Sequence, residues 1–345
     1  MTEAAARSDP STTPGGERTA ARLAFARAAL DDPTVALERA SEDAWFRTYW
    51  RVASNDHSYI VMDAPTAQID LVPFLRIGGI LRDTGLRAPE VLAQDLDQGF
   101  LLLSDLGRAT FLQAFETGAD PEPLMDAAVD ALVTLQKIEV PTWIPVYDAA
   151  LLERELALFP DWYLERHLGT PLSDADRATW MDASARLVEA ALAQPRVFVH
   201  RDYMPRNLMP GTPDAGDIGI LDFQDAVLGP IAYDPVCLVK DAFWSWPSGQ
   251  ADAWLRRYWN KARAAALPVR EWQTFRRDAD WIGMQRHLKV IGIFARLYHR
   301  DDKRHYVADV PRFFAYLFDV LPRYPEFRCL EQLLRRHSAA GSGLS

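Results

Sequence analysis

The 345-residue sequence is poor in cysteine and lysine, and it lacks any long apolar run. Its two cysteines, Cys237 and Cys329, suit neither a disulfide framework nor a CxxC site, which favours a reducing cytoplasm. No apolar stretch approaches the roughly 20 residues that a membrane-spanning helix needs. The polar N-terminus also lacks the apolar core of a secretory signal. We therefore expect neither a membrane span nor secretion.

The shortage of lysine constrains any anion-binding site. Only five of the 38 basic residues are lysine, and the first of them is Lys137. Codon usage explains such a bias, but a site before residue 137 that needs a cation must use arginine. The net charge of −10 disfavours a nucleic-acid partner. The remaining composition, 49% hydrophobic and 25% charged, is that of a folded chain, and its length favours two lobes.

The periodicity of apolar residues changes along the chain. Helical spacing at 18–30 and 67–84 alternates with strand-like stretches at 45–51, 58–62, 89–94 and 100–103, and Asn55-Asp56 marks a hairpin turn. Beyond residue 107 helices predominate, at 124–138, 151–167, 173–193 and from 233 to about 335, with short apolar strands at 197–199 and 218–221.

These patterns predict an α+β, bilobal, protein-kinase-like fold with a small antiparallel β-rich N-lobe and a larger helical C-lobe. The divisions are a disordered tail (1–17), the N-lobe (18–103), a hinge (104–107), the C-lobe core (108–240), a further helical part (241–335) and a second tail (336–345).

The most informative segment follows the apolar strand at 197–199. It reads His200-Arg201-Asp202, and Asn207 comes five positions after the aspartate. This is the H-R-D-x-x-x-x-N loop of phosphoryl-transfer enzymes. One compact loop can present an aspartate to an acceptor hydroxyl and an amide oxygen to a metal ion. The spacing therefore predicts Asp202 as the catalytic base and Asn207 as a metal ligand.

A second apolar strand delivers Asp222, at the start of Asp-Phe-Gln-Asp, twenty residues after Asp202. In the kinase pattern this aspartate holds Mg²⁺ on the phosphates, and carboxylate and amide oxygens are ligands that Mg²⁺ prefers. Downstream, Asp234 follows a Gly-Pro turn at the start of a helix. We expect Asp234, with His200, to support the catalytic loop.

These motifs together resemble the aminoglycoside-phosphotransferase-like kinases, and within them the anomeric N-acetylmuramate/N-acetylglucosamine kinases of cell-wall recycling. Stretches 61–65, 99–107 and 285–297 add to the resemblance, which extends from about residue 40 to 325. It implies an enzyme that uses ATP and Mg²⁺ to phosphorylate the C1 hydroxyl of a small amino sugar in peptidoglycan recycling. We also expect a cytoplasmic monomer.

The resemblance implies that the hinge backbone at Ser104, Asp105 and Leu106 contacts adenine. The sequence departs from the kinase pattern where a phosphate-binding lysine is expected, because this strand reads Val61-Met62-Asp63, and no glycine occurs at 40–49 in place of a phosphate-covering loop. Strand alternation puts Arg47 and Arg51 on one face, so we predict that one of them neutralises the nucleotide phosphates.

The acceptor site is predicted from residue type. A basic stretch at 286–305 would suit the carboxylate of N-acetylmuramate, and carboxylates and aromatic faces suit sugars. The candidates are Arg201, Gln224, Asp241, Trp246, Arg286 and Lys289. Two alternatives stay open: a kinase for another hydroxyl acceptor (an aminoglycoside, choline or homoserine), and a non-catalytic pseudokinase, which the missing lysine would suit.

Overall fold

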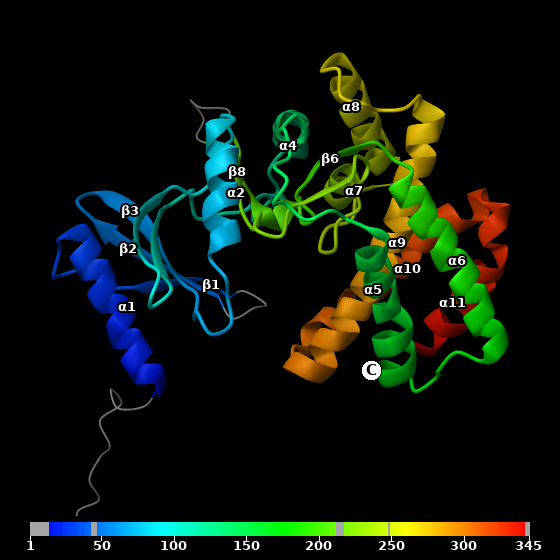
Figure 1. Ribbon diagram of the computed structural model, residues 1–345, viewed down its shortest axis with the longest axis horizontal. Coiled ribbons are helices and arrows are strands. Elements are labelled where there is room, and N and C mark those ends of the chain that lie inside the picture. The colour runs from blue at the N-terminus through cyan, green and yellow to red at the C-terminus, as the bar shows by residue number, and fades with distance from the viewer. Residues whose placement is uncertain (1–13, 43–46, 212–216, 248, 342–345) are drawn as a thin grey trace, which may run out of the picture. The chain divides into compact units, whose positions relative to one another are not determined.

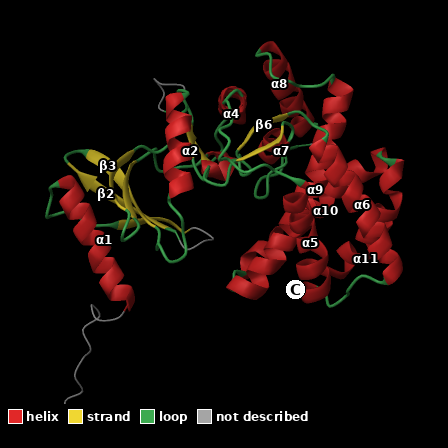
Figure 2. Ribbon diagram, viewed as in Figure 1, coloured by secondary structure: helices red, strands yellow, loops and turns green. Residues whose placement is uncertain are grey.

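The computed structural model describes residues 14–42, 47–211, 217–247 and 249–341. The chain divides into two compact units, Met1–Arg108 with Gly219–Gln224, and Ala109–Ile218 with Asp225–Ser345. Figure 2 shows a β-sheet in the first unit and mostly helices in the second. The predicted α+β class, with a small antiparallel part and a larger helical part, is confirmed.

The first unit is built on a five-stranded antiparallel sheet with the order β1-β2-β3-β5-β4. Its strands are β1 (Glu38–Glu42), β2 (Thr48–Ser54), β3 (His57–Asp63), β4 (Val91–Asp95) and β5 (Phe100–Ser104). Asn55 and Asp56 join β2 to β3 with φ values of 49° and 63°, as a two-residue hairpin turn requires. Residues 43–46, within the predicted phosphate-covering segment, lie outside the described residues.

The helix α1 (Pro14–Leu30) packs along the sheet (Figure 1). Phe25 stacks on Phe100 with ring centroids 5.7 Å apart, and Ala26 joins a buried cluster that contains Val52 and Val61. The predicted tail (1–17) therefore ends too late, because α1 already begins at Pro14; residues 1–13 lie outside the described residues.

The helix α2 (Val72–Asp83) confirms the core of the helix predicted over 67–84. Phe74, Ile77 and Leu81 share one face and are buried. The helix ends at Thr84, after which Gly85 adopts a φ of 81°. The segment Gly219–Gln224 also belongs to the first unit, where β8 (Gly219–Ile220) forms a parallel bridge to Arg87.

The second unit is organised around the 30-residue helix α9 (Trp272–Asp301), the yellow-to-orange helix of Figure 1. It packs against α5 (Ala149–Leu158), α6 (Asp174–Leu192), α7 (Tyr233–Val239) and α10 (Val310–Val320). The other helices are α3 (Phe111–Glu116), α4 (Pro121–Gln136), α8 (Gln250–Ala264) and α11 (Arg328–Gly341). The antiparallel strands β6 (Arg196–Val199) and β9 (Val227–Pro230) form a small sheet, and β7 (Leu208–Met209) follows the loop that contains Asp202 and Asn207.

Two predicted boundaries in the second unit are corrected. The helix predicted over 151–167 changes at Phe159 into the π-helical segment η2 (Phe159–His167). Pro160 lies in this segment and has no N–H to donate to the carbonyl of Leu156. The predicted tail (336–345) begins inside α11, which continues to Gly341. None of the described helices has an apolar stretch long enough to cross a bilayer.

Candidate active site

The loop after β6 is bent sharply at Arg201. His200 is buried, and Arg201 has a φ of 76°, in the left-handed region. Arginine rarely adopts this conformation, and residues held in it gather at functional sites. The bend comes directly before Asp202, and the short 3₁₀ segment η3 (Pro205–Asn207) completes the loop.

Asp234, in the first turn of α7, holds the bent backbone. Its carboxylate accepts hydrogen bonds from the N–H of His200 at 2.7 Å and from the N–H of Arg201 at 2.9 Å. Burial raises the pKa of Asp234 to about 7, although these two donors oppose the rise. The structure therefore brings together the two residues for which the sequence predicts a supporting role.

Asn207 closes the same loop onto the predicted base. Its Nδ2 donates to the carbonyl of Asp202 at 2.9 Å, as does the N–H of Met204 at the same distance. Because the amide nitrogen is used within the loop, the amide oxygen is the atom that Asn207 can offer to a cation.

Buried charges surround the side chain of Arg201. Its guanidinium forms an ion pair with Glu155 of α5, and Lys289 of α9 lies 2.7 Å from the same carboxylate. Tyr147 donates its hydroxyl to Glu155, and Lys289 also contacts the hydroxyl of Tyr233 at 3.1 Å. Burial would raise the pKa of Glu155, but Lys289 and Arg201 outweigh that effect and lower it to about 2.

Glu155 is absent from the functional candidates predicted from the sequence. One signal was available, because Glu155 lies three residues after Leu152 and one before Leu156 on the buried face of α5. A carboxylate on the apolar face of a helix predicts a buried cationic partner.

Asp241 and Arg286 form a second buried polar group in this unit. The Asp241 Oδ1 accepts the N–H of Ala242 at 2.6 Å, and its buried Oδ2 has no hydrogen-bond partner among the described residues. Burial raises the pKa of Asp241 to about 6, against the influence of Arg286. Arg286 donates to the carbonyl of Lys240 at 3.3 Å. The first residue of the basic stretch at 286–305 is therefore buried in the protein interior.

Trp246 lies in an aromatic cluster. Its ring packs edge-on against Phe115 with centroids 5.3 Å apart, and it contacts Trp244 at 6.1 Å and Trp254 at 6.3 Å. These neighbours hold the indole in place and account for part of its buried surface.

The predicted metal loop belongs to the first unit. Asp222 has a φ of 61° and is about one-third exposed (35%). Phe223 is fully buried and stacks on Phe74 of α2 with centroids 5.0 Å apart. A Cβ atom at Gly78 would lie 3.2 Å from the Phe223 ring, so a glycine at this position lets α2 approach the loop closely.

The structure distinguishes the two candidate arginines. Arg47 is buried, and its Nη2 lies 3.3 Å from Asp222 Oδ1, which also accepts a 2.8 Å hydrogen bond from Gln224. Arg51 instead binds Asp105 through Nε at 2.6 Å and donates to the carbonyl of Gly107 at 2.8 Å. Arg47 is therefore the arginine beside the predicted metal ligand, whereas Arg51 braces the hinge.

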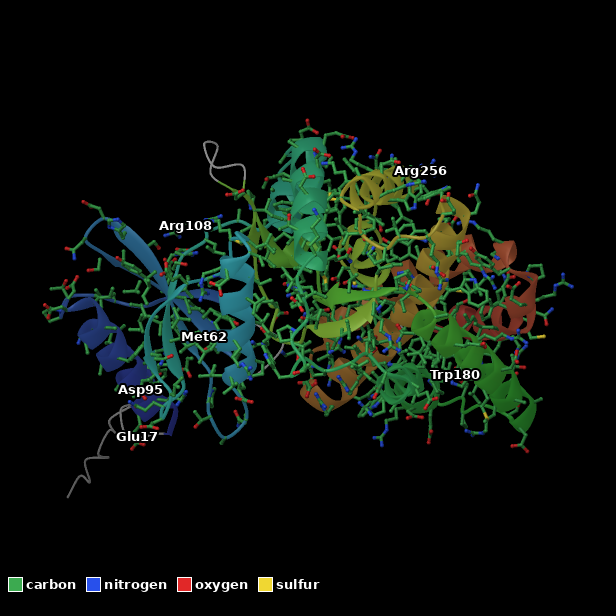
Figure 3. The ribbon with its side chains drawn as sticks, turned by 45° about the horizontal axis from the view of Figure 1, so that its top comes forward. Glu17, Met62, Asp95, Arg108, Trp180 and Arg256 are labelled. Carbon is green, nitrogen blue, oxygen red and sulfur yellow. The ribbon has the colours of Figure 1, made fainter. Side chains whose placement is uncertain are left out.

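The strand expected to carry a lysine is engaged in packing. Met62, labelled in Figure 3, is fully buried in β3. Asp63 binds Arg18 and Arg22 of α1 at 2.6 and 2.8 Å, which fixes that helix to the sheet. Position 63 therefore anchors α1.

The hinge is held by side chains of the first unit. Asp105 accepts hydrogen bonds from Ser58 Oγ at 2.6 Å and from the Gly107 N–H at 3.0 Å, in addition to Arg51. Ser104 continues the strand pairing by donating its N–H to Glu90, and Arg87 binds the carbonyl of Leu106. Residues 104–107 therefore have a defined backbone.

The donor atoms in the two loops suit a hard divalent cation. Asn207 supplies an amide oxygen and Asp222 a carboxylate, which are donors typical of Mg²⁺ sites completed by phosphate and water oxygens. In the described part of the chain no three His, Cys, Asp or Glu side chains gather as a metal cluster. Each of the two predicted ligands therefore carries an oxygen donor of the kind that Mg²⁺ prefers.

Comparison with known proteins supports the motif assignment. A profile of the phosphotransferase enzyme family matches residues 36–273. The N-acetylmuramate/N-acetylglucosamine kinase of Pseudomonas aeruginosa is 52% identical over 303 residues, which cover 88% of each chain. The kinase of the same name from Neisseria meningitidis is 44% identical over 300 residues, covering 86% of this chain and 88% of that one.

A solved structure shares the fold. An ethanolamine kinase from Plasmodium vivax aligns with a TM-score of 0.64 at 12% identity, covering 90% of this chain and 89% of that one. The predicted kinase-like fold is confirmed.

Proposed function

The chain belongs to the phosphotransferase enzyme family, and we propose that it uses ATP and Mg²⁺ to phosphorylate the anomeric (C1) hydroxyl of N-acetylmuramate, N-acetylglucosamine or both. The observation that carries the proposal is the 52% identity over 303 residues to a kinase named for these two sugars. The product would be the α-1-phosphate, and such a reaction would serve peptidoglycan recycling in the cytoplasm.

In this proposal Asp202 is the catalytic base. Its carboxylate orients the C1 hydroxyl and accepts the proton as the oxygen bonds to the γ-phosphorus and the bond from that phosphorus to ADP breaks. A hemiacetal hydroxyl is more acidic than an ordinary alcohol, which suits a carboxylate base. The backbone bonds from His200 and Arg201 to Asp234 support this role, because they limit movement of the loop that carries Asp202.

The nucleotide site is proposed from the predicted metal ligands, one arginine and the segment 104–106. Asn207 and Asp222 would bind Mg²⁺, which neutralises phosphate charge and helps to position the phosphates. We assign the phosphate-binding cation to Arg47, because it already lies beside Asp222. The backbone at Ser104, Asp105 and Leu106 would contact adenine.

For the acceptor, Asp241 is the best supported candidate. Its Oδ2 is buried with no hydrogen-bond partner in the described chain, and a sugar hydroxyl or N-acetyl N–H would supply one. Arg286 acts electrostatically on Asp241, and its charge would suit the lactyl carboxylate of N-acetylmuramate. Trp246 stays a candidate for contact with the sugar ring. Gln224 and Arg201 remain sequence-based candidates, and Lys289 is engaged with Glu155.

A coupled ADP-release assay tests the proposal. Purified protein is offered N-acetylmuramate, N-acetylglucosamine, kanamycin and choline, with Asp202→Asn as the inactive control. N-acetylglucosaminitol, the borohydride-reduced sugar, serves as the matched acceptor, because it keeps the other hydroxyls but has no hemiacetal. We expect turnover of one or both amino sugars and none of the alditol.

Each competing function has its own outcome in this assay. Turnover of kanamycin or choline alone would show that the substrate is another hydroxyl acceptor and not an amino sugar. Nucleotide binding without turnover of any acceptor would indicate a pseudokinase. Activity that persists in Asp202→Asn would show that Asp202 is not the catalytic base.

A further inference from the structure

We propose that Glu155 is a positioning residue that keeps the guanidinium of Arg201 away from its neighbour, the catalytic carboxylate of Asp202. The inference rests on the proposed function, because it takes Asp202 as the base. It assigns a role in the phosphoryl transfer to a residue of α5 that lies outside the motif.

The first support is the saturation of the Glu155 carboxylate. The side chain is about 7% exposed, and both oxygens are occupied. Oε1 accepts a hydrogen bond from the guanidinium of Arg201 and pairs with the ammonium of Lys289 at 2.7 Å. Oε2 accepts hydrogen bonds from the hydroxyl of Tyr147 and from the amide of Gln285, the latter at 3.2 Å. Glu155 thus joins α5, α9 and the catalytic loop.

The second support is the backbone of Arg201. A non-glycine residue in the left-handed region is strained, so the surroundings must hold it. Here Asp234 holds the N–H, Cys237 Sγ lies 3.3 Å from the carbonyl, and Glu155 holds the guanidinium. With both ends of Arg201 fixed, the direction of the chain into Asp202 is fixed as well.

The third support is the balance of charge. Arg201 and Lys289 are two cations that share one carboxylate, and both also interact electrostatically with Asp202. Asp202 is the further carboxylate that acts on both cations, and Arg201 Nη1 also lies 3.5 Å from the carbonyl oxygen of Asp225. A buried cation without its partner is strongly unfavourable, so Arg201 would turn towards Asp202 and weaken it as a base.

Other charged or titratable groups face this cluster and stay unchanged in the test. They come from the loop before α5, from α7 and from α9, and are Tyr147, Tyr233, Asp234, Cys237 and Arg286. The two groups that change are Glu155 and, in one variant, Lys289.

The test compares kcat and KM of the parent, Glu155→Gln and the double variant Glu155→Gln with Lys289→Met, with ATP and N-acetylglucosamine. The first substitution adds one positive charge to the cluster, and the second removes it again. We expect Glu155→Gln to lose about tenfold or more in kcat, with little change in the KM for ATP. The double variant should regain part of kcat.

Asp278→Asn is the matched control for the loss of a buried carboxylate. Asp278 lies on α9, is 7% exposed and pairs with Arg270 at 3.4 Å. It should leave kcat and the KM for ATP as in the parent. Circular dichroism and the Tm establish that each variant is folded.

Crystal structures of the parent and Glu155→Gln provide a readout that does not need activity. We expect the Arg201 guanidinium to contact the Asp202 carboxylate in the variant; a guanidinium that stays in place overturns the inference. A kcat that falls without rescue by Lys289→Met also overturns it. Failure of the proposed function is seen separately, as absence of sugar turnover by the parent or activity of Asp202→Asn.

Discussion

Arg47 replaces the missing lysine in our account, so its removal should weaken ATP binding specifically. The guanidinium is buried beside Asp222, at 3.3 Å from its Oδ1, and a charge-assisted contact to phosphate contributes about 1.5–3 kcal/mol. At about 1.4 kcal/mol for each factor of ten, Arg47→Ala should raise the KM for ATP roughly ten- to hundredfold. The KM for the sugar should change little.

Two other arginines of the first unit supply controls. Arg51→Ala removes the partner of Asp105, so its main effect should be a lower free energy of unfolding. It should raise the KM for ATP less than Arg47→Ala does. Arg108, labelled in Figure 3, is 71% exposed and lies 3.9 Å from Glu38, so Arg108→Ala should be silent. Steady-state kinetics and calorimetric titration with ADP measure nucleotide binding, and urea unfolding measures the free energy of unfolding. Parent-like ATP binding by Arg47→Ala would refute the assignment.

Three further predictions concern packing and charge. Gly78→Val should push the Phe223 ring aside and so lower kcat and Mg²⁺ affinity, whereas Gly79→Val should be tolerated, because a Cβ there meets no atom within 4 Å. Asp63→Ala should lower the free energy of urea unfolding by about 3–5 kcal/mol, because it leaves Arg18 and Arg22 without their carboxylate. The pKa of Glu155 is about 2 in the folded protein, against an ordinary value of 4.5. The ionised carboxylate therefore stabilises the fold above pH 4.5 by on the order of 3 kcal/mol. This stabilisation should be lost as the pH falls from 4.5 towards 2.

Each of these has a decisive comparison. Equal activity of Gly78→Val and Gly79→Val would contradict the packing of α2 on the metal loop. Unfolding curves of Asp63→Ala that match the parent would show that its ion pairs contribute nothing. For Glu155, urea unfolding at pH 5 and pH 3 should show a smaller loss of stability in Glu155→Gln than in the parent, and equal losses would contradict the assignment.

Local spacing predicted much of the fold and of the candidate site. The hairpin at Asn55-Asp56 and the helix ending at Gly85 follow from turn chemistry and apolar periodicity, which neighbouring residues determine. The catalytic loop is recognisable because Asp202 and Asn207 are five residues apart, and the structure joins them by a hydrogen bond.

What the sequence could not predict depends on contacts between distant residues. The strand β1 is polar and becomes a strand by pairing with β2, so it lacks a pattern of its own. Strand alternation placed Arg47 and Arg51 on one face but could not choose between them, because their partners Asp222 and Asp105 lie 175 and 54 residues away. The role of Glu155 likewise depends on α9, more than 100 residues later.

The position of the transferred phosphate is the most direct test of the central claim. N-acetylglucosamine labelled with ¹³C at C1 is incubated with the protein, ATP and Mg²⁺, and the product is examined by ³¹P NMR. We predict a new phosphorus signal that is split by the labelled carbon, as a phosphate on the C1 oxygen requires. An unsplit sugar-phosphate signal would place the phosphate on another hydroxyl and contradict the claim.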